Sequence, residues 1–147
     1  MQKYAGAFLH NLDKNYRLAI PSKFHHHLGE EFMVYKPLNG TKCLYLYSVE
    51  DWEMAVAEVF SELKGSELND TQRRLYMNIA SATLDKQGRA TIGKNFCEFA
   101  GLEKEVIVLG VWKRVEIWNP DEYDKQQKRN EEKLALGGRT TKIHLSI

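Results

Sequence analysis

The sequence lacks any long hydrophobic segment. Among its 147 residues no apolar run approaches the roughly 18 residues that a membrane-spanning helix needs. The N-terminal segment MQKYAGAFLHN has neither the apolar region nor the cleavage site of a secretory signal. Hydrophobic residues nevertheless make up 43% of the chain, which is ordinary for a protein that folds around a core. We therefore expect a soluble, cytoplasmic globular protein with no membrane partner.

Cysteine and net charge are also scarce. The two cysteines, Cys43 and Cys97, lie far apart in apolar surroundings, which predicts reduced core thiols rather than a disulfide or a metal pair. The 21 Lys and Arg residues balance 20 Asp and Glu residues, so the net charge is only +1. Overall charge therefore indicates no polyanionic partner, and any nucleic-acid site must concentrate positive charge locally.

Motifs typical of enzymes and metal sites are missing too. There is no phosphate-binding glycine loop, no nucleophile elbow and no supported acid pair. His25, His26 and His27 are consecutive, and consecutive helical residues point about 100° apart, whereas a helical metal pair needs a spacing of three or four. His10 and His144 are distant from them in sequence. We expect no enzyme, cofactor, metal or small-molecule substrate, and we place the three histidines on a solvated helix face, one of them near an oligomer contact.

The sequence does contain an internal repeat. LDKNYRLAIPSKF at residues 12–24 returns as LDKQGRATIGKNF at residues 84–96, an offset of 72. Farther along, CLYLYSVEDW at residues 43–52 matches RVEIWNPDEY at residues 114–123 after a one-residue slip. The match spans most of each half, so the chain is built from two related units.

Each unit is predicted to have the element order β-β-α-β-β. Two strands flank a polar turn, and alternation places Leu18 and Ile20, or Ala90 and Ile92, on one side. SKFHHHLG and KNFCEFAG then predict short helices, each ending at a Gly that can adopt the left-handed conformation. Two further strands complete each unit. Because units of about 45 residues are too small to bury a core alone, the two must share one, and the predicted class is α+β.

Helix signals separate and follow the repeats. Ser48 and Asp51 resemble a capping box, a linking helix is predicted from about Asp70 to Met77, and Asn119-Pro120 opens a C-terminal helix. The aromatic residues at positions 52, 118 and 123 are predicted to pack in the core or between subunits, and the stretch DKQQKRNEEK to form a charge-balanced exposed helix. The final GRTTKIHLSI alternates in polarity, and we expect a neighbouring subunit to hold it.

The predicted organisation has four parts. They are a first repeat at 4–52, linking helices at 53–77, a second repeat at 78–124, and a C-terminal helix and tail at 125–147.

The chemistry of the repeat lies in its turn. In each copy an Asp precedes an Arg by four residues, with a Lys between them. An Asp at the head of a turn commonly accepts hydrogen bonds from backbone N–H groups, which leaves Lys and Arg to project outward. Arg can bind phosphate or a guanine edge with its planar fork, and Lys binds phosphate as a point charge. The alternative is an Asp–Arg surface ion pair that only stabilises the hairpin by about 0–1 kcal/mol. The predicted DNA contacts are Arg17, Arg89, Lys14 and Lys86, and the predicted supports are Asp13 and Asp85.

These residues resemble a known family. The signature L-D-x-x-G-R-x-x-I-P is similar to that of the AbrB/SpoVT class of bacterial DNA-binding proteins. The first copy carries Tyr16 at the Gly position, and the second keeps Gly88 there but carries Gly93 at the Pro position. Two copies in one chain, followed by AGLEKEVIVLGVWKRVEIW, resemble the MraZ family over nearly residues 1–125.

This resemblance implies a fold and a function. The fold is a swapped-hairpin AbrB-type barrel with flanking helices, and such chains assemble into a homo-oligomeric ring. The implied function is sequence-specific binding of double-stranded DNA at tandem promoter repeats, as a nucleoid-associated transcriptional regulator that represses the division and cell-wall gene cluster containing its own gene. A ring would add up the turns of several subunits. The alternative is a protein-interaction or antitoxin-like scaffold on the same barrel without strong DNA binding.

Tyr16 is the residue that favours this alternative. If the family's Gly has a positive φ, a Tyr there would cost roughly 1–2 kcal/mol, so we expect the first turn to have changed shape. Asn15 replaces a basic residue common in the family's first turn, which weakens the same half. Tyr16 is also a candidate DNA contact, through a hydrogen bond from its hydroxyl to phosphate, whereas Gly88 should support the second turn.

Overall fold

The computed structural model describes residues 3–135, in two halves with the same order of elements. The predicted tail, with His144, lies outside these residues. The first half comprises β1 (Tyr4–Asn11), β2 (Arg17–Ala19), α1 (Ser22–Leu28), β3 (Glu31–Tyr35) and β4 (Leu44–Ser48). The link comprises α2 (Val49–Ser61) and α3 (Gly65–Tyr76). The second half comprises β5 (Ile79–Thr83), β6 (Arg89–Thr91), α4 (Lys94–Ala100), β7 (Glu105–Trp112) and β8 (Arg114–Trp118), and α5 (Pro120–Ala135) follows. The predicted α+β class is confirmed.

The two halves exchange strands. A six-stranded antiparallel sheet has the order β1-β7-β8-β4-β3-β5, and β2 pairs with β6 in a separate ribbon. β1 of the first half therefore lies along β7 of the second, and β5 of the second lies along β3 of the first. Neither half can complete its sheet alone. The closed barrel is not confirmed, because the sheet is open, with β1 and β5 at its edges.

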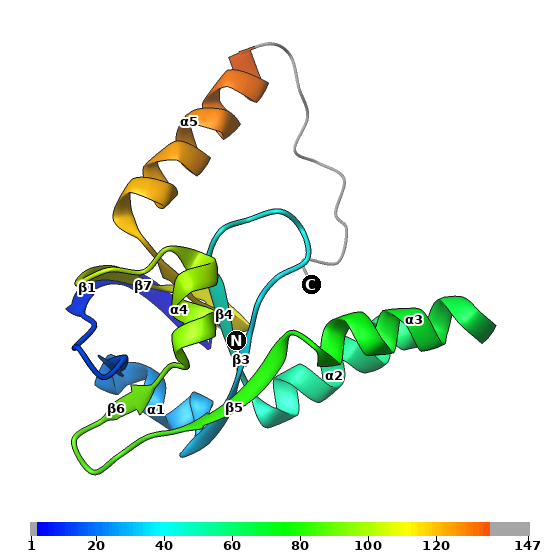
Figure 1. Cartoon of the computed structure of the whole chain (residues 1–147), viewed down its shortest axis with the longest axis horizontal. Coiled ribbons are helices and arrows are strands. Elements are labelled where there is room, and N and C mark those ends of the chain that lie inside the picture. The colour runs from blue at the N-terminus through cyan, green and yellow to red at the C-terminus, as the bar shows by residue number, and fades with distance from the viewer. Residues whose placement is uncertain (1–2, 136–147) are drawn as a thin grey trace.

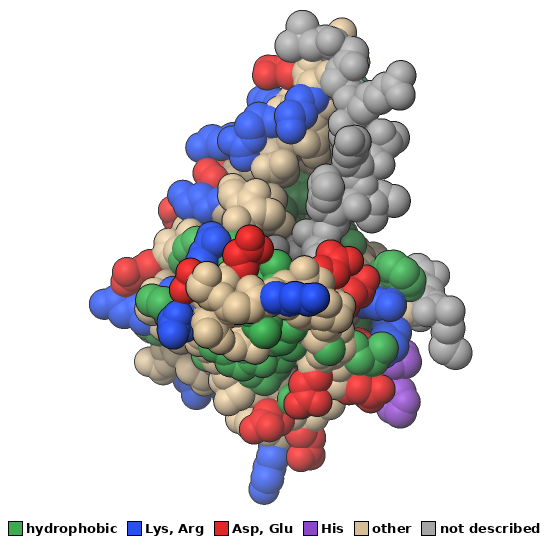
Figure 2. Space-filling view, turned by 90° about the vertical axis from the view of Figure 1, so that its right-hand side faces the viewer, with side chains coloured by type: hydrophobic (Ala, Val, Ile, Leu, Met, Phe, Trp, Pro, Cys, Tyr) green, Lys and Arg blue, Asp and Glu red, His purple; other side chains and the backbone are tan. Residues whose placement is uncertain are grey.

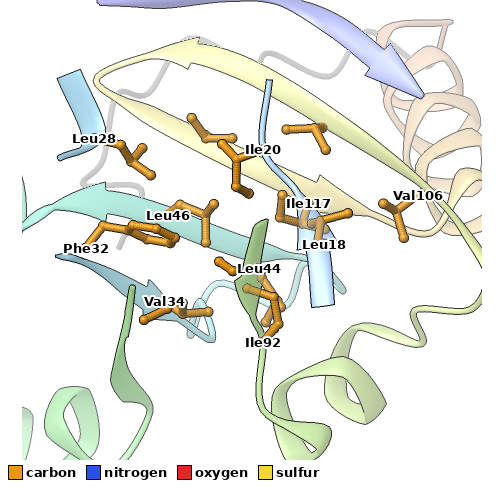
Figure 3. Close-up of a cluster of buried hydrophobic side chains, with 14 of the residues drawn as sticks. Leu18, Ile20, Leu28, Phe32, Val34, Leu44, Leu46, Ile92, Val106 and Ile117 are labelled. Carbon is orange, nitrogen blue, oxygen red and sulfur yellow. The ribbon is translucent and has the colours of Figure 1, made fainter. Parts of the chain in front are cut away.

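The main core lies between the ribbon and one face of the sheet (Figure 3). Leu18 and Ile20 from the first half, with Ala90 and Ile92 from the second, are almost completely buried against the sheet. The predicted inward alternation of these strands is thus confirmed. Burying a Leu or Ile side chain contributes roughly 1.5–3 kcal/mol, which holds in place a ribbon too short to be stable by itself.

A second, aromatic cluster packs on the opposite face of the sheet. Alternate residues of β4 enter the two clusters, so Leu46 faces the ribbon while Tyr45 and Tyr47 face the other way. Trp52 of α2 and Trp118 of β8 complete the aromatic cluster and are only 2% and 4% exposed. The prediction that these two tryptophans pack in the core is confirmed.

Most helix boundaries follow local signals. Ser48 Oγ accepts a hydrogen bond from Asp51 N–H at 3.0 Å, as the capping box predicted. However, α3 begins at Gly65, five residues before the predicted start. Its first residues favour turns, which hid this start in the sequence, and packing through Leu75 stabilises them as part of the helix. Gly101 adopts the left-handed conformation, with φ 64° and ψ 31°. Gly29 does not, since its φ of 84° is combined with a ψ of 172°.

The helices outside the sheet extend in two directions. The pair formed by α2 and α3 runs away from the sheet on one side, and α5 projects on another (Figure 1). The N-terminus of α5 is capped by Asn119, whose Oδ1 accepts a hydrogen bond from Asp121 N–H at 2.8 Å. No described residue of α5 is buried. Between residues 3 and 135, no helix is both long enough and apolar enough to cross a membrane.

Candidate nucleic-acid interface

The second repeated turn is held by its own aspartate. Asp85 Oδ1 accepts backbone hydrogen bonds from Gln87 at 2.8 Å and Arg89 at 2.9 Å. Two backbone bonds close the turn, from Asp85 N–H to Arg89 O at 2.8 Å and from Gly88 N–H to Asp85 O at 3.0 Å. Gly88 has φ 75°, a conformation that glycine adopts readily. This geometry places Arg89 at the start of β6.

The first turn has the same geometry although Tyr16 replaces the glycine. Asp13 Oδ1 accepts hydrogen bonds from the backbone of Asn15 and Arg17 at 2.8 and 2.9 Å. The closing bonds from Asp13 N–H to Arg17 O and from Tyr16 N–H to Asp13 O are both 3.0 Å. Tyr16 itself has φ 60°. The prediction of a changed turn was wrong, because Tyr16 packs partly against the main core, and this burial offsets a conformational cost of roughly 1–2 kcal/mol.

Each aspartate also forms an ion pair with its arginine. Arg17 Nε donates to Asp13 Oδ2 at 2.9 Å, and Arg89 Nε donates to Asp85 Oδ2 at 3.2 Å. The pKa of each carboxyl is lowered, first by the backbone N–H of the arginine and further by that of the residue two positions after the aspartate. Both carboxylates therefore stay ionised at neutral pH and hold their turns.

The two arginines lie on the same outward face of the ribbon. Leu18 and Ala90 are opposite each other and point into the core, so the residues beside them point outward. Arg17 is opposite Thr91, two residues beyond Arg89, which makes the two arginines diagonal neighbours with Cα atoms about 7–8 Å apart. The turns themselves lie at opposite ends of the ribbon.

Both guanidinium groups keep donors available. The side chains of Arg17 and Arg89 are 37% and 33% exposed, and their ion pairs use only Nε. Between residues 3 and 135 their terminal nitrogens donate no hydrogen bond. Lys14 and Lys86 are exposed in the turns and form no ion pair with a described residue. The surface thus offers two planar forks and two mobile ammonium groups, suited to phosphate and base-edge acceptors.

One residue at this surface escaped the sequence prediction. His25 of α1 donates from Nε2 to Ile20 O at 2.7 Å, and its ring lies under Gly88 of the second turn. The prediction of a solvated face is therefore wrong for His25. The repeat contained a signal, because His25 aligns with Cys97, which is buried. Cys43 is buried as well, and neither thiol forms a disulfide.

Two other features, the run of histidines and the charged helix α5, lie outside the two turns in sequence. In the described part of the chain, no group of three histidine, cysteine or acidic side chains has an arrangement that could hold a metal ion. Figure 2 shows lysine and arginine side chains along α5, with acidic groups among them. Lys128 and Arg129 are exposed there, far along the chain from both turns.

Comparison with known proteins supplies independent information. The family model described as "MraZ protein, putative antitoxin-like" matches the chain twice, at residues 4–74 and 75–141.

Three bacterial proteins named transcriptional regulator MraZ are similar to the chain over most of its length. The protein of Acetivibrio thermocellus is 37% identical over 122 residues, which cover 82% of this chain and 84% of that protein. The protein of Desulforamulus reducens is 37% identical over 133 residues, covering 87% and 89%, respectively. The protein of Lachnoclostridium phytofermentans is 33% identical over 132 residues, covering 90% and 92%.

Proposed function

This chain belongs to the MraZ family, and from that premise we propose that it is a transcriptional regulator that binds double-stranded DNA through the ribbon of β2 and β6. The observation that carries the proposal is the pair of arginines on the outward face of this ribbon. The major groove is about 12 Å wide and admits a two-stranded ribbon. Arg17 and Arg89, diagonal neighbours about 7–8 Å apart, would enter it together.

The side chains have distinct proposed roles. The arginines contact base edges, because each fork can bond O6 and N7 of a guanine while Nε stays paired with its aspartate. Lys14 and Lys86, at the two ends of the ribbon, contact the phosphates on either side. The ring of Tyr16 packs against the core, and its hydroxyl is the group proposed to reach a phosphate. Asp13, Asp85 and Gly88 support the turns.

A single ribbon would bind weakly, so assembly is part of the proposal. Each neutralised phosphate adds about 0.9 to the log–log salt slope, and in this arrangement one chain offers only the cations Lys14 and Lys86 to phosphates. Several subunits in a ring would place successive ribbons against tandem promoter repeats and multiply their affinity. Six large hydrophobic side chains of the described residues are more than half exposed, and we propose that some of them are buried between subunits. They are Leu9, Met54, Tyr76, Met77, Trp112 and Leu134.

The remaining features of the proposal follow from the family. We propose that the chain represses the promoter of the division and cell-wall cluster containing its own gene, in the cytoplasm and in association with the nucleoid. We also propose that the ribbon and the open sheet form the family's swapped-hairpin barrel, which the exchange of β1 and β5 between the halves supports.

Fluorescence anisotropy on the DNA upstream of the gene tests this function. Wild-type protein should bind tightly and with a steep salt dependence, whereas Arg17→Ala/Arg89→Ala should lose at least about tenfold in affinity. Lys128→Ala/Arg129→Ala removes the same charge from α5 and serves as the matched control. Native mass measurements should show the same assembly for all three proteins. Absent or salt-independent binding by the wild-type protein would favour the scaffold alternative instead.

A further inference from the structure

A chain of hydrogen bonds connects α1 of the first half to the turn of the second. His25 Nε2 donates to Ile20 O at 2.7 Å, and Ile20 N–H donates to Gly88 O at 3.0 Å. Gly88 N–H in turn donates to Asp85 O at 3.0 Å. Since Arg89 follows Gly88 directly, any shift of this backbone moves the arginine.

The first turn is connected in the same way by the equivalent residues. Cys97 of α4 lies 72 positions after His25, and its Sγ is 3.6 Å from Ile92 O. Ile92 N–H donates to Tyr16 O at 2.8 Å, and Tyr16 N–H donates to Asp13 O at 3.0 Å. Each helix therefore supports the turn that belongs to the opposite half.

The two connections differ in whether the helix or the turn carries the larger side chain. At the second turn the large residue is His25, and a Cβ atom added to Gly88 would lie 2.8 Å from its Cε1. At the first turn the small residue is Cys97, and Tyr16 carries a side chain at φ 60°. The His25 ring cannot move aside without breaking its bond to Ile20. In one connection the helix carries the large side chain and the turn carries glycine, and in the other connection the helix carries the small side chain and the turn carries tyrosine.

We propose that His25 is a positioning residue for Arg89, and that residues 25 and 88 act as a matched pair that decides where the second turn holds its arginine. For its effect on DNA, this inference rests on the proposed function. His25 need not touch DNA in this role. It acts through Ile20 and Gly88, by fixing the backbone from which Arg89 projects.

Replacing the histidine tests the hydrogen-bonded connection. His25→Leu should weaken DNA binding by roughly fivefold to tenfold and speed hydrogen exchange at the Gly88 and Arg89 amides. His25→Gln, which can retain a donor near the Nε2 position, should bind within about threefold of wild type. The neighbouring exposed residue supplies the control, and His26→Leu should change neither measurement. Affinities are compared at a temperature where every variant is fully folded.

Exchanging size tests the matched pair. Gly88→Ala should lose roughly tenfold in affinity. Gly88→Ala/His25→Cys should recover part of that loss, because cysteine removes the overlap with the His25 ring while the strain of a side chain at φ 75° remains. A double variant no better than Gly88→Ala, or unchanged amide exchange in His25→Leu, would overturn the positioning role. If wild-type protein fails to bind the DNA, the proposed function falls, and amide exchange at residues 85–89 in the same variants still decides the positioning role.

Discussion

Gly93 occupies the position at which the first half has a proline, and the structure predicts that Gly93→Pro stabilises the protein. Gly93 has φ −55° and ψ 146°, close to the φ −51° and ψ 131° of Pro21. Proline requires a φ near −65° and a residue without a backbone donor bond. Between residues 3 and 135, no hydrogen bond uses the Gly93 N–H. Ile20 shows that an isoleucine in the preceding position tolerates the proline.

The expected gain comes from the unfolded chain. A compatible proline lowers the conformational entropy of the unfolded state and raises the free energy of unfolding by about 0.4–1 kcal/mol. A Cβ at Gly93 would be 3.7 Å from Phe96 Cδ1, an ordinary contact, so no steric cost should reduce the gain. For a chain of this length, the gain corresponds to a rise in Tm of about 1–4 °C.

Calorimetry or thermal denaturation followed by circular dichroism measures this rise. Gly40→Pro is the control, because a Cβ there meets no atom within 4 Å but φ is 86°, which proline cannot adopt. Gly40→Pro should therefore lower Tm while Gly93→Pro raises it. If Gly93→Pro lowered Tm as well, the reasoning from repeat-equivalent backbone geometry would be refuted.

Three further predictions concern the sheet, the aromatic face and the turns. Gly110→Ala should lower the free energy of unfolding in urea by about 2–3 kcal/mol, because its Cβ would overlap the β1 backbone; a loss under 1 kcal/mol would contradict this. Glu116→Gln should lower the free energy of unfolding by about 3 kcal/mol in the same assay, since this buried carboxylate accepts a hydrogen bond from Arg114 Nε at 2.8 Å. An unchanged free energy of unfolding would count against a stabilising ion pair between Glu116 and Arg114. In a carbon-13 NMR titration, Asp13 and Asp85 should have pKa values below 3.8. Their stabilisation of the turns should then be complete above that pH and be lost as the pH falls through the lower pKa values of the folded state. Titration midpoints at 3.8 or above would disprove this prediction.

The local features of the fold were predictable because neighbouring residues determine them. Alternation identified the buried sides of β2 and β6, and the capping box located the start of α2 at Ser48. The start of α3 was not predictable in this way. Packing through Leu75 on the aromatic cluster stabilises a helix whose first turns contain residues that favour turns.

The candidate site was predictable only in part. The repeat identified the two arginine-bearing turns as the candidate site. The sequence wrongly predicted, however, that Tyr16 changes the shape of the first turn and that His25 lies on a solvated helix face. Both errors have the same cause. The energy that keeps Tyr16 at a positive φ and the ring that lies under Gly88 come from segments distant in sequence.

By itself the sequence determined the duplicated turn, the order of elements in each half and the class of the fold, since short-range hydrogen bonds and polarity patterns encode all three. Tertiary structure alone decided that the halves exchange strands, that Arg17 and Arg89 share one face, and that each turn rests on the other half's helix. These are pairings between segments distant in sequence, and their register is chosen by burial of the shared core, which no local pattern specifies.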